Sequence, residues 1–195
     1  MNKGRLEAFS DGVLAIIITI MVLEIKVPHG SQWIVLKPLI PTFISYVLSF
    51  VFVGVYWANH HHMLHSVKNV TGSMIWANIN LLFWLSLIPF ATGWMGENCL
   101  APNTIAIYGI VLLLSGIAYI ILQKVIENNS LDIERLKIAF VNMKRKGIAS
   151  TIGYCIAIPL AYISPIISGG IFVLIAIVWL LPDKNIEEAL KEMKE

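Results

Sequence analysis

Long apolar stretches alternate with short polar segments along the whole chain. A helix needs about 20 apolar residues to cross the hydrocarbon core of a membrane, with a range of roughly 17 to 25. Six stretches approach or meet this length, and we expect them to be membrane spans: residues 8–27, 41–59, 72–95, 104–122, 148–163 and 165–181. The last two are the shortest, and the sequence leaves open a broken hairpin that does not cross fully. The predicted fold class is an all-α membrane protein, a single domain over 1–195 with six transmembrane helices.

Two segments outside the predicted spans also carry helical signals. Residues 130–146 place acidic side chains first and basic side chains last, which matches the helix dipole. An apolar stripe on the same segment predicts a helix that lies along the membrane surface. In the tail, Glu187 precedes Lys191 by four residues, so we expect a short cytoplasmic helix over 184–195.

Composition supports a membrane location. Of the 195 residues, 57% are hydrophobic and 13% are charged, whereas a soluble domain carries about 25% charged residues. The net charge of +2 gives no reason to expect nucleic acid as a partner, and two cysteines are too few for a disulfide framework. The first apolar run has no small-residue cleavage site, so we expect no cleavable signal peptide.

Basic residues are distributed unevenly between the two sides that six spans would define. Of the 14 lysines and arginines, all except Lys26 and Lys37 fall on the side of the two termini. Positive charge stays on the cytoplasmic side of a membrane. We therefore expect a multi-pass protein of the cell membrane with both termini in the cytoplasm.

The first span begins with an unusual polar pattern. Arg5, Ser10 and Asp11 precede or open a nearly unbroken apolar run. A carboxylate at the mouth of a lipid-length helix is costly and needs partners. We interpret these three side chains as groups that fix the orientation of the helix by bonding to its neighbours.

The same helix carries a continuous stripe on another face. Helical spacing places the following residues on one side: Gly12, Ile16, Thr19, Ile20 and Leu23. Asp11 lies about 140° away from Ile16 at 100° per residue. The stripe and the polar anchor therefore face different neighbours, which favours a helix held from one side and open on the other.

The end of the second span collects four of the five histidines in the chain: His60, His61, His62 and His65. His61 and His65 are four residues apart, a spacing that allows a shared metal ion. With no carboxylate or cysteine close in sequence, an interfacial polar network is the simpler interpretation, and we predict no metal site. One or two of these histidines are expected partners of Asp11. A membrane metal transporter or metalloenzyme that uses the His60–His65 cluster remains the alternative function.

The arginine, three residues and Phe-Ser-Asp that form Arg5 to Asp11 resemble the signature of the transmembrane-protein-175 family of potassium channels. The histidine-rich end of the second span and the six-span pattern extend this resemblance over nearly the whole chain. The sequence also has no TVGYG-type filter, so we expect no re-entrant pore loop. The resemblance implies a prokaryotic single-repeat member that assembles as a homotetramer, with a central pore lined by the first helix.

Counting residues along the chain from the Phe-Ser-Asp motif assigns roles to the residues of the apolar stripe on the first helix. The resemblance places a hydrophobic constriction at Ile16, Ile20 and Leu23, with a hydroxyl layer at Thr19. It also implies that the motif anchors the pore helix, and we add three histidines as candidate partners, giving this set: Arg5, Phe9, Ser10, Asp11, His61, His62 and His65. The expected function is a channel with moderate selectivity for potassium over sodium. We expect no enzymatic activity and no cofactor, with K⁺ as the permeant ion and the lipid bilayer as the surroundings.

Overall fold

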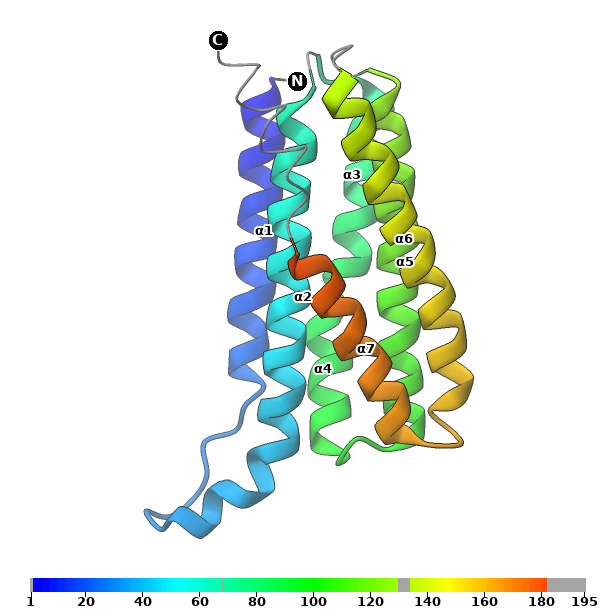
Figure 1. Ribbon diagram of the computed structural model, residues 1–195. Helices are drawn as coiled ribbons and strands as arrows, with labels where there is room; N and C mark the ends of the chain where they lie inside the picture. Colours follow the sequence, from blue (N-terminus) through cyan, green and yellow to red (C-terminus); the bar gives the residue numbers. More distant parts are fainter. Residues whose placement is uncertain (1, 68, 130–133, 182–195) are drawn as a thin grey trace.

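The computed structural model describes residues 2–67, 69–129 and 134–181, which form helices joined by loops (Figure 1). A short 3-10 helix, η1 (Trp33–Leu39), lies between the first two α-helices. The α-helices are α1 (Lys3–Leu23), α2 (Ile40–His65), α3 (Gly72–Leu85), α4 (Ile88–Glu97), α5 (Pro102–Glu127), α6 (Glu134–Leu160) and α7 (Pro165–Leu180).

Two of these helices, α3 and α4, together form one broken span. Only Ser86 and Leu87 separate them, and Pro89 at the start of α4 has no N–H with which to continue the helical ladder. With α3 and α4 counted once, the described chain has six helical segments, which confirms the predicted all-α fold class. Among the described residues, four segments are long and apolar enough to cross a membrane: 3–23, 33–65, 72–97 and 102–127. Helix α7 is apolar but has only 16 residues.

Helix α6 differs from the expectation of separate surface and spanning helices. Residues 134–160 form one continuous helix, so the segment expected to lie along the membrane surface continues directly into the predicted fifth span. Gly147 lies within the continuous helix, at a close contact between α6 and α5: a Cβ there would lie 3.2 Å from the Ile120 side chain. Residues 130–133 and the predicted tail helix over 184–195 lie outside the described residues.

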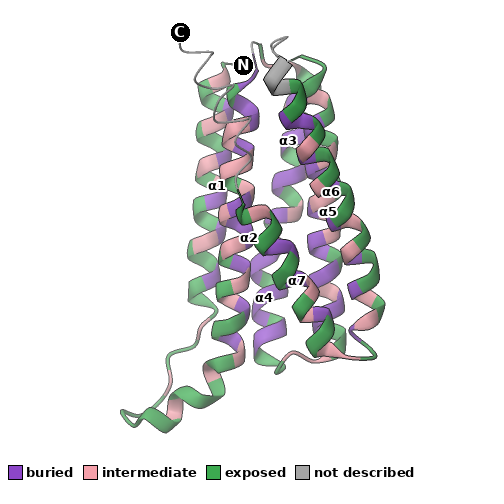
Figure 2. Cartoon of the chain, viewed as in Figure 1, coloured by how far each residue is buried: buried purple, intermediate pink, exposed green. Residues whose placement is uncertain are grey.

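The core lies where α2, α3, α4 and α5 meet, and Figure 2 shows buried residues on the facing sides of these helices. Its largest fully buried side chains include Phe52, Met74, Leu81, Leu85, Ile88 and Tyr108. Helices α2 and α4 approach especially closely, since a Cβ on Gly96 would lie only 2.6 Å from Thr42 Cα. Helix α1 packs on the side of this core against α2, α3 and α4.

Candidate functional site

Helix α1 has two sharply different faces. One face is buried against the bundle and contains Leu6, Ser10, Leu14, Ile17 and Met21. The other face is apolar but exposed: Ile16 is 58% exposed, Ile20 41% and Leu23 78%, and Thr19 is also exposed. The structure therefore places all four residues of the predicted constriction on the face of α1 that its own subunit leaves uncovered.

Thr19 adds the one polar side chain among these four residues. Its hydroxyl donates a hydrogen bond to the backbone carbonyl of Ile16 at 2.9 Å. A hydroxyl has one proton and two acceptor lone pairs. Because the proton is used within the helix, the exposed side of Thr19 offers an oxygen that accepts, which is what a cation needs.

A chain of buried hydrogen bonds holds the opposite face of α1. Asn78 on α3 donates from Nδ2 to Ser10 Oγ at 2.9 Å, and its Oδ1 lies 2.7 Å from His60 Nε2 on α2. An amide oxygen only accepts, so His60 must donate from Nε2. Ser10 in turn donates to the carbonyl of Leu6 at 2.8 Å. The four residues are all buried, and their bonds join three helices.

Asp11 has a different partner from the one expected. The indole Nε1 of Trp57 on α2 donates to Asp11 Oδ1 at 3.0 Å. We expected a histidine to bond to Asp11, but the structure shows the Trp57 indole as the donor. Helical geometry explains the change, because Trp57 lies one turn before His61 on α2 and its longer side chain reaches α1.

The remaining members of the expected anchoring set lie around this bond. His61 stacks on Trp57 with ring centroids 6.3 Å apart and meets His65 edge-on at 4.9 Å. The Lys3 ammonium donates to the backbone carbonyl of His65 at 3.0 Å. The edge of the His62 ring faces His61 at 5.9 Å. His61 therefore buttresses the indole that holds Asp11.

Two motif residues contribute less than expected. Phe9 is 57% exposed on the open side of α1, and Arg5 is also exposed. Within the described ranges the Arg5 side chain forms no hydrogen bond or ion pair. The network is instead completed by three residues outside the expected anchoring set: Trp57, Asn78 and His60, the last of which belongs to the histidine cluster. Asn78 could have been found from sequence, because an asparagine in an apolar span usually bonds to a neighbouring helix. Trp57 could not, because a tryptophan near the end of a span is also typical of an aromatic side chain at the membrane interface.

Glu7 brings a further acidic group to the same end of α1. Its Oε1 is buried and has no hydrogen-bond partner among the described residues. A lone buried carboxylate oxygen is costly. Glu7, Asp11 and the histidines therefore gather both carboxylate and imidazole groups there, yet the described residues contain no cluster of three or more side chains suited to a metal ion.

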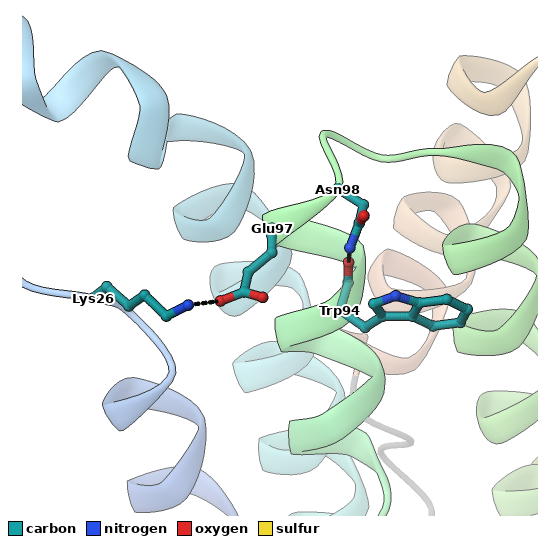
Figure 3. A network of polar contacts seen from close by, with 4 residues as sticks. All are labelled: Lys26, Trp94, Glu97 and Asn98. Carbon is teal, nitrogen blue, oxygen red and sulfur yellow. Dashed lines mark hydrogen bonds and ion pairs between the residues drawn. The ribbon is translucent and has the colours of Figure 1, made fainter.

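The far end of α1 is tied to α4 by an ion pair. Lys26, just after α1, points its ammonium at the carboxylate of Glu97, as Figure 3 shows. The hydrogen bond from Lys26 to Glu97 and the negative charge of Glu97 raise the pKa of Lys26 above its usual 10.5. Asn98 closes the end of α4 by donating to the Trp94 carbonyl at 2.9 Å.

An open cavity of about 510 Å³ lies between α1 and the α3–α4 span. Its walls include Ile16 and Ile20 of α1 and Phe90 and Trp94 of α4, whose rings stack at 6.2 Å. The cavity continues the uncovered apolar surface of α1 onto α4. One subunit therefore presents a wide apolar surface that contains the predicted constriction.

Comparisons with known proteins agree with this arrangement. The model of the endosomal/lysosomal potassium channel TMEM175 family matches residues 5–89. A potassium channel of Chryseobacterium sp. (strain P1-3) is 54% identical over 192 residues, which cover 98% of this chain and 100% of the relative. The endosomal/lysosomal proton channel TMEM175 of Gallus gallus is 36% identical over 103 residues, which cover 47% of this chain and 21% of that protein.

The fold agrees as well. The crystal structure of a lysosomal potassium-selective channel TMEM175 homologue from Chamaesiphon minutus superposes with a TM-score of 0.78 and 28% sequence identity, covering 91% of this chain and 96% of that one. The family match includes α1 with its Arg5 to Asp11 motif and the bonded residues of α2 and α3. These are ion channels rather than enzymes, which confirms the expectation that the chain is not an enzyme. The chain belongs to the TMEM175 family of potassium channels.

Proposed function

We propose that this protein forms a potassium channel in the cell membrane, as a homotetramer whose central pore is lined by α1. The observation that carries the proposal is the uncovered apolar face of α1, with Ile16, Ile20 and Leu23 exposed. A closed symmetric ring buries equivalent surfaces of each copy. Four copies around one axis bring these faces together and enclose a path that a single subunit lacks.

The constriction discriminates between ions through dehydration. A ring of isoleucine side chains supplies no oxygen to replace water around an ion, so an ion passes only after losing part of its hydration shell. Potassium holds its water less tightly than sodium, and the cost is therefore lower for potassium. The accepting oxygens of Thr19 lie one turn from Ile16 and offset part of this cost. Moderate selectivity for potassium over sodium follows.

The same ring provides a gate. A hydrophobic constriction closes a pore by dewetting when it narrows slightly. Rotation of α1 sets the width, and the bonds from Trp57 to Asp11 and from Asn78 to Ser10 resist that rotation. The polar network is thus an orienting device for the pore helix, and it does not itself contact the ion.

Charge distribution sets the orientation in the membrane. The basic residues outside the spans lie mainly on the side of the chain termini, which favours cytoplasmic termini. Lys26 and Glu97 then lie at the outer mouth of the pore. No cofactor is needed for this function, in which K⁺ is the permeant ion and the bilayer the immediate partner.

Reconstitution into planar bilayers tests the proposal. With potassium and sodium on opposite sides, we expect a reversal potential that favours potassium. Ile16→Asn introduces an amide into the constriction and should raise the conductance and move the reversal potential toward zero. The matched control is Ile152→Asn on α6, because Ile152 is 56% exposed and lies outside the proposed pore. Unchanged conductance and selectivity in Ile16→Asn would place the constriction elsewhere.

Proton conduction is the second candidate, favoured by the name of the Gallus gallus relative. Liposomes loaded with a pH-sensitive dye separate the two. A pH change that needs no potassium gradient and no potassium would assign the current to protons. A potassium flux without a matching pH change would support the first candidate.

A further inference from the structure

A second cavity lies away from α1, inside the packing of α2, α5, α6 and α7. Figure 1 shows α7 running diagonally between α2 and α6. Trp179, near the end of α7, closes one side of the cavity, and its Nε1 donates to Ser150 Oγ at 2.8 Å. Gly116 and Gly147 line the cavity from α5 and α6 without side chains. At Gly116 the missing side chain leaves space, because a Cβ there would lie 3.8 Å from its nearest neighbours, Tyr154 and the Tyr56 hydroxyl.

A buried hydroxyl in this cavity has no partner. Tyr119 on α5 is 2% exposed, and its Oη forms no hydrogen bond among the described residues. An unpaired polar atom in this position is costly, since the membrane interior offers no bulk water. The cavity itself must therefore hold whatever satisfies the hydroxyl.

Other side chains around the cavity also carry polar atoms that can form hydrogen bonds. The Tyr56 ring packs edge-on against Tyr119 with ring centroids 5.8 Å apart, and Tyr56 lines the same cavity. Its Oη lies 3.8 Å from where a Cβ of Gly116 would lie. Both tyrosines line this one small cavity, so each hydroxyl can serve as a donor to a molecule bound there.

Acceptors complete the set. Asn59 uses Nδ2 to donate to the Val55 carbonyl at 2.8 Å, which leaves Oδ1 available. Ser150 Oγ donates to the Lys146 carbonyl and accepts from Trp179, so one lone pair remains. Both residues line the cavity. Two donors and two acceptors are the complement of a single water molecule.

We propose that this cavity binds one structural water molecule, which accepts from Tyr119 and Tyr56 and donates to Asn59 and Ser150. The space open to the centre of a water molecule is about 20 Å³, and one water needs roughly 10–15 Å³ with two to four polar partners. The water joins α2 to α5 and α6. Tyr56 and Asn59 directly precede Trp57 and His60 on α2. The water-mediated contact therefore supports the part of α2 that bonds to Asp11 of α1 and to Asn78.

The sign of a stability change tests the proposal. Tyr119→Phe removes the hydroxyl and keeps the ring. If the cavity is wet, the variant leaves the water underbonded and the thermal midpoint in detergent falls, by about 2–4 °C for each kcal/mol lost in a chain of this size. If the cavity is dry, removing an unsatisfied hydroxyl leaves the midpoint unchanged or raises it, which overturns the proposal. Tyr162→Phe is the control, because Tyr162 is exposed.

A second pair of measurements is independent of that sign. In the double variant Tyr56→Phe with Tyr119→Phe, a shared water predicts that the two effects fall short of additivity, whereas separate hydroxyls give additive effects. A high-resolution density map of the wild-type protein should contain a peak within hydrogen-bond distance of both tyrosine hydroxyls. A clear map without that peak also overturns the proposal.

Discussion

At the scale of single residues, α1 is held by a few buried polar atoms rather than by charge alone. Ser10, Asn78 and His60 each lie in the apolar interior, and each is satisfied by the next. Such a chain is specific because a shift of α3 breaks both interhelical bonds of Asn78, and a shift of α1 or α2 breaks one of them. Asp11 and Trp57 add a bond of the same kind closer to the surface. Orientation of α1 is therefore fixed by geometry that apolar packing alone does not provide.

Asn78→Ala tests this network. A hydrogen bond between helices in a membrane is worth about 0.6 kcal/mol on average. Here the substitution leaves both His60 Nε2 and Ser10 Oγ without Asn78, so we expect a loss of about 1–2 kcal/mol in the free energy of unfolding. The measurement is denaturant unfolding in mixed micelles. Asn98→Ala provides the control, because its amide bonds only the end of its own helix at an exposed position, and we expect a change within about 0.5 kcal/mol.

The Lys26–Glu97 pair predicts a pH dependence at the opposite end of α1. Its hydrogen bond raises the pKa of Lys26 above 10.5. A raised lysine pKa means that the stabilisation is complete below pH 10.5 and is lost only as the pH rises through the folded-state value. The difference in thermal midpoint between wild type and Lys26→Met should be small, constant from pH 7 to 10, and smaller still above that range. Lys37→Met, without an ion pair in the described ranges, should show no such trend.

At the scale of helices, close approach depends on where side chains are missing. The α2–α4 contact forms at Gly96, where the backbone of Thr42 occupies the position of a Cβ. Small residues allow helices to pack tightly in membranes, where lipid provides little hydrophobic drive for association. This contact positions α4 beside α1, and with it Glu97 and the wall of the 510 Å³ cavity.

Gly96→Ala should therefore destabilise the bundle. The added methyl group meets Thr42 Cα at 2.6 Å, a backbone atom that cannot rotate away. Overpacking of this kind typically costs about 1–3 kcal/mol. Gly54→Ala on α2 is the matched control, since nothing lies within 4 Å of its Cβ position and alanine favours the helix by roughly 0.5–1 kcal/mol. Equal effects of the two substitutions on unfolding would contradict the argument.

Helices were more predictable from sequence than the contacts between them. Apolar runs gave the all-α class, and the 3.6-residue period placed Ile16 and Leu23 on one face of α1. Continuity of α6 through Gly147 was not predicted, because a glycine that follows a cluster of basic residues is also the usual signal for the end of a helix. The partner of Asp11 was missed for a different reason, since which of Trp57 and His61 reaches α1 depends on how α2 is rotated.

At the scale of the whole molecule, a single chain leaves a wide apolar surface uncovered. The apolar surface from Ile16 to Leu23 on α1 continues across Phe90 and Trp94 on α4. Lipid can cover such a surface, but lipid gives no reason for a threonine oxygen within it or for a polar anchor on the opposite face of α1. In the tetramer that we propose, at least part of this surface meets other copies of the chain.

Cross-linking at Leu23 tests whether this face of α1 contacts lipid or other copies of the chain. In a protein with Cys99 and Cys155 replaced by serine, Leu23→Cys places a thiol at a position whose side chain is 78% exposed on the uncovered face of α1. A short bifunctional maleimide should join neighbouring subunits and give a dimer band on a denaturing gel, because each chain carries one thiol. Met21→Cys, 1% exposed on the opposite face, should remain monomeric.

The same sample decides the number of subunits. Native mass spectrometry from mild detergent should give four chains of 21.8 kDa each. Cross-linking at Leu23 equal to that at Ile152→Cys on the outer surface of α6 would indicate random collision in the membrane. In that case the face of α1 meets lipid, and the pore must form elsewhere. Cross-linking confined to Leu23 would instead show that the exposed face of α1 meets other copies of the chain. Met21 lies on the same helix but faces the bundle of its own subunit. Together with four chains in the mass spectrum, this result would support a closed ring of α1 helices.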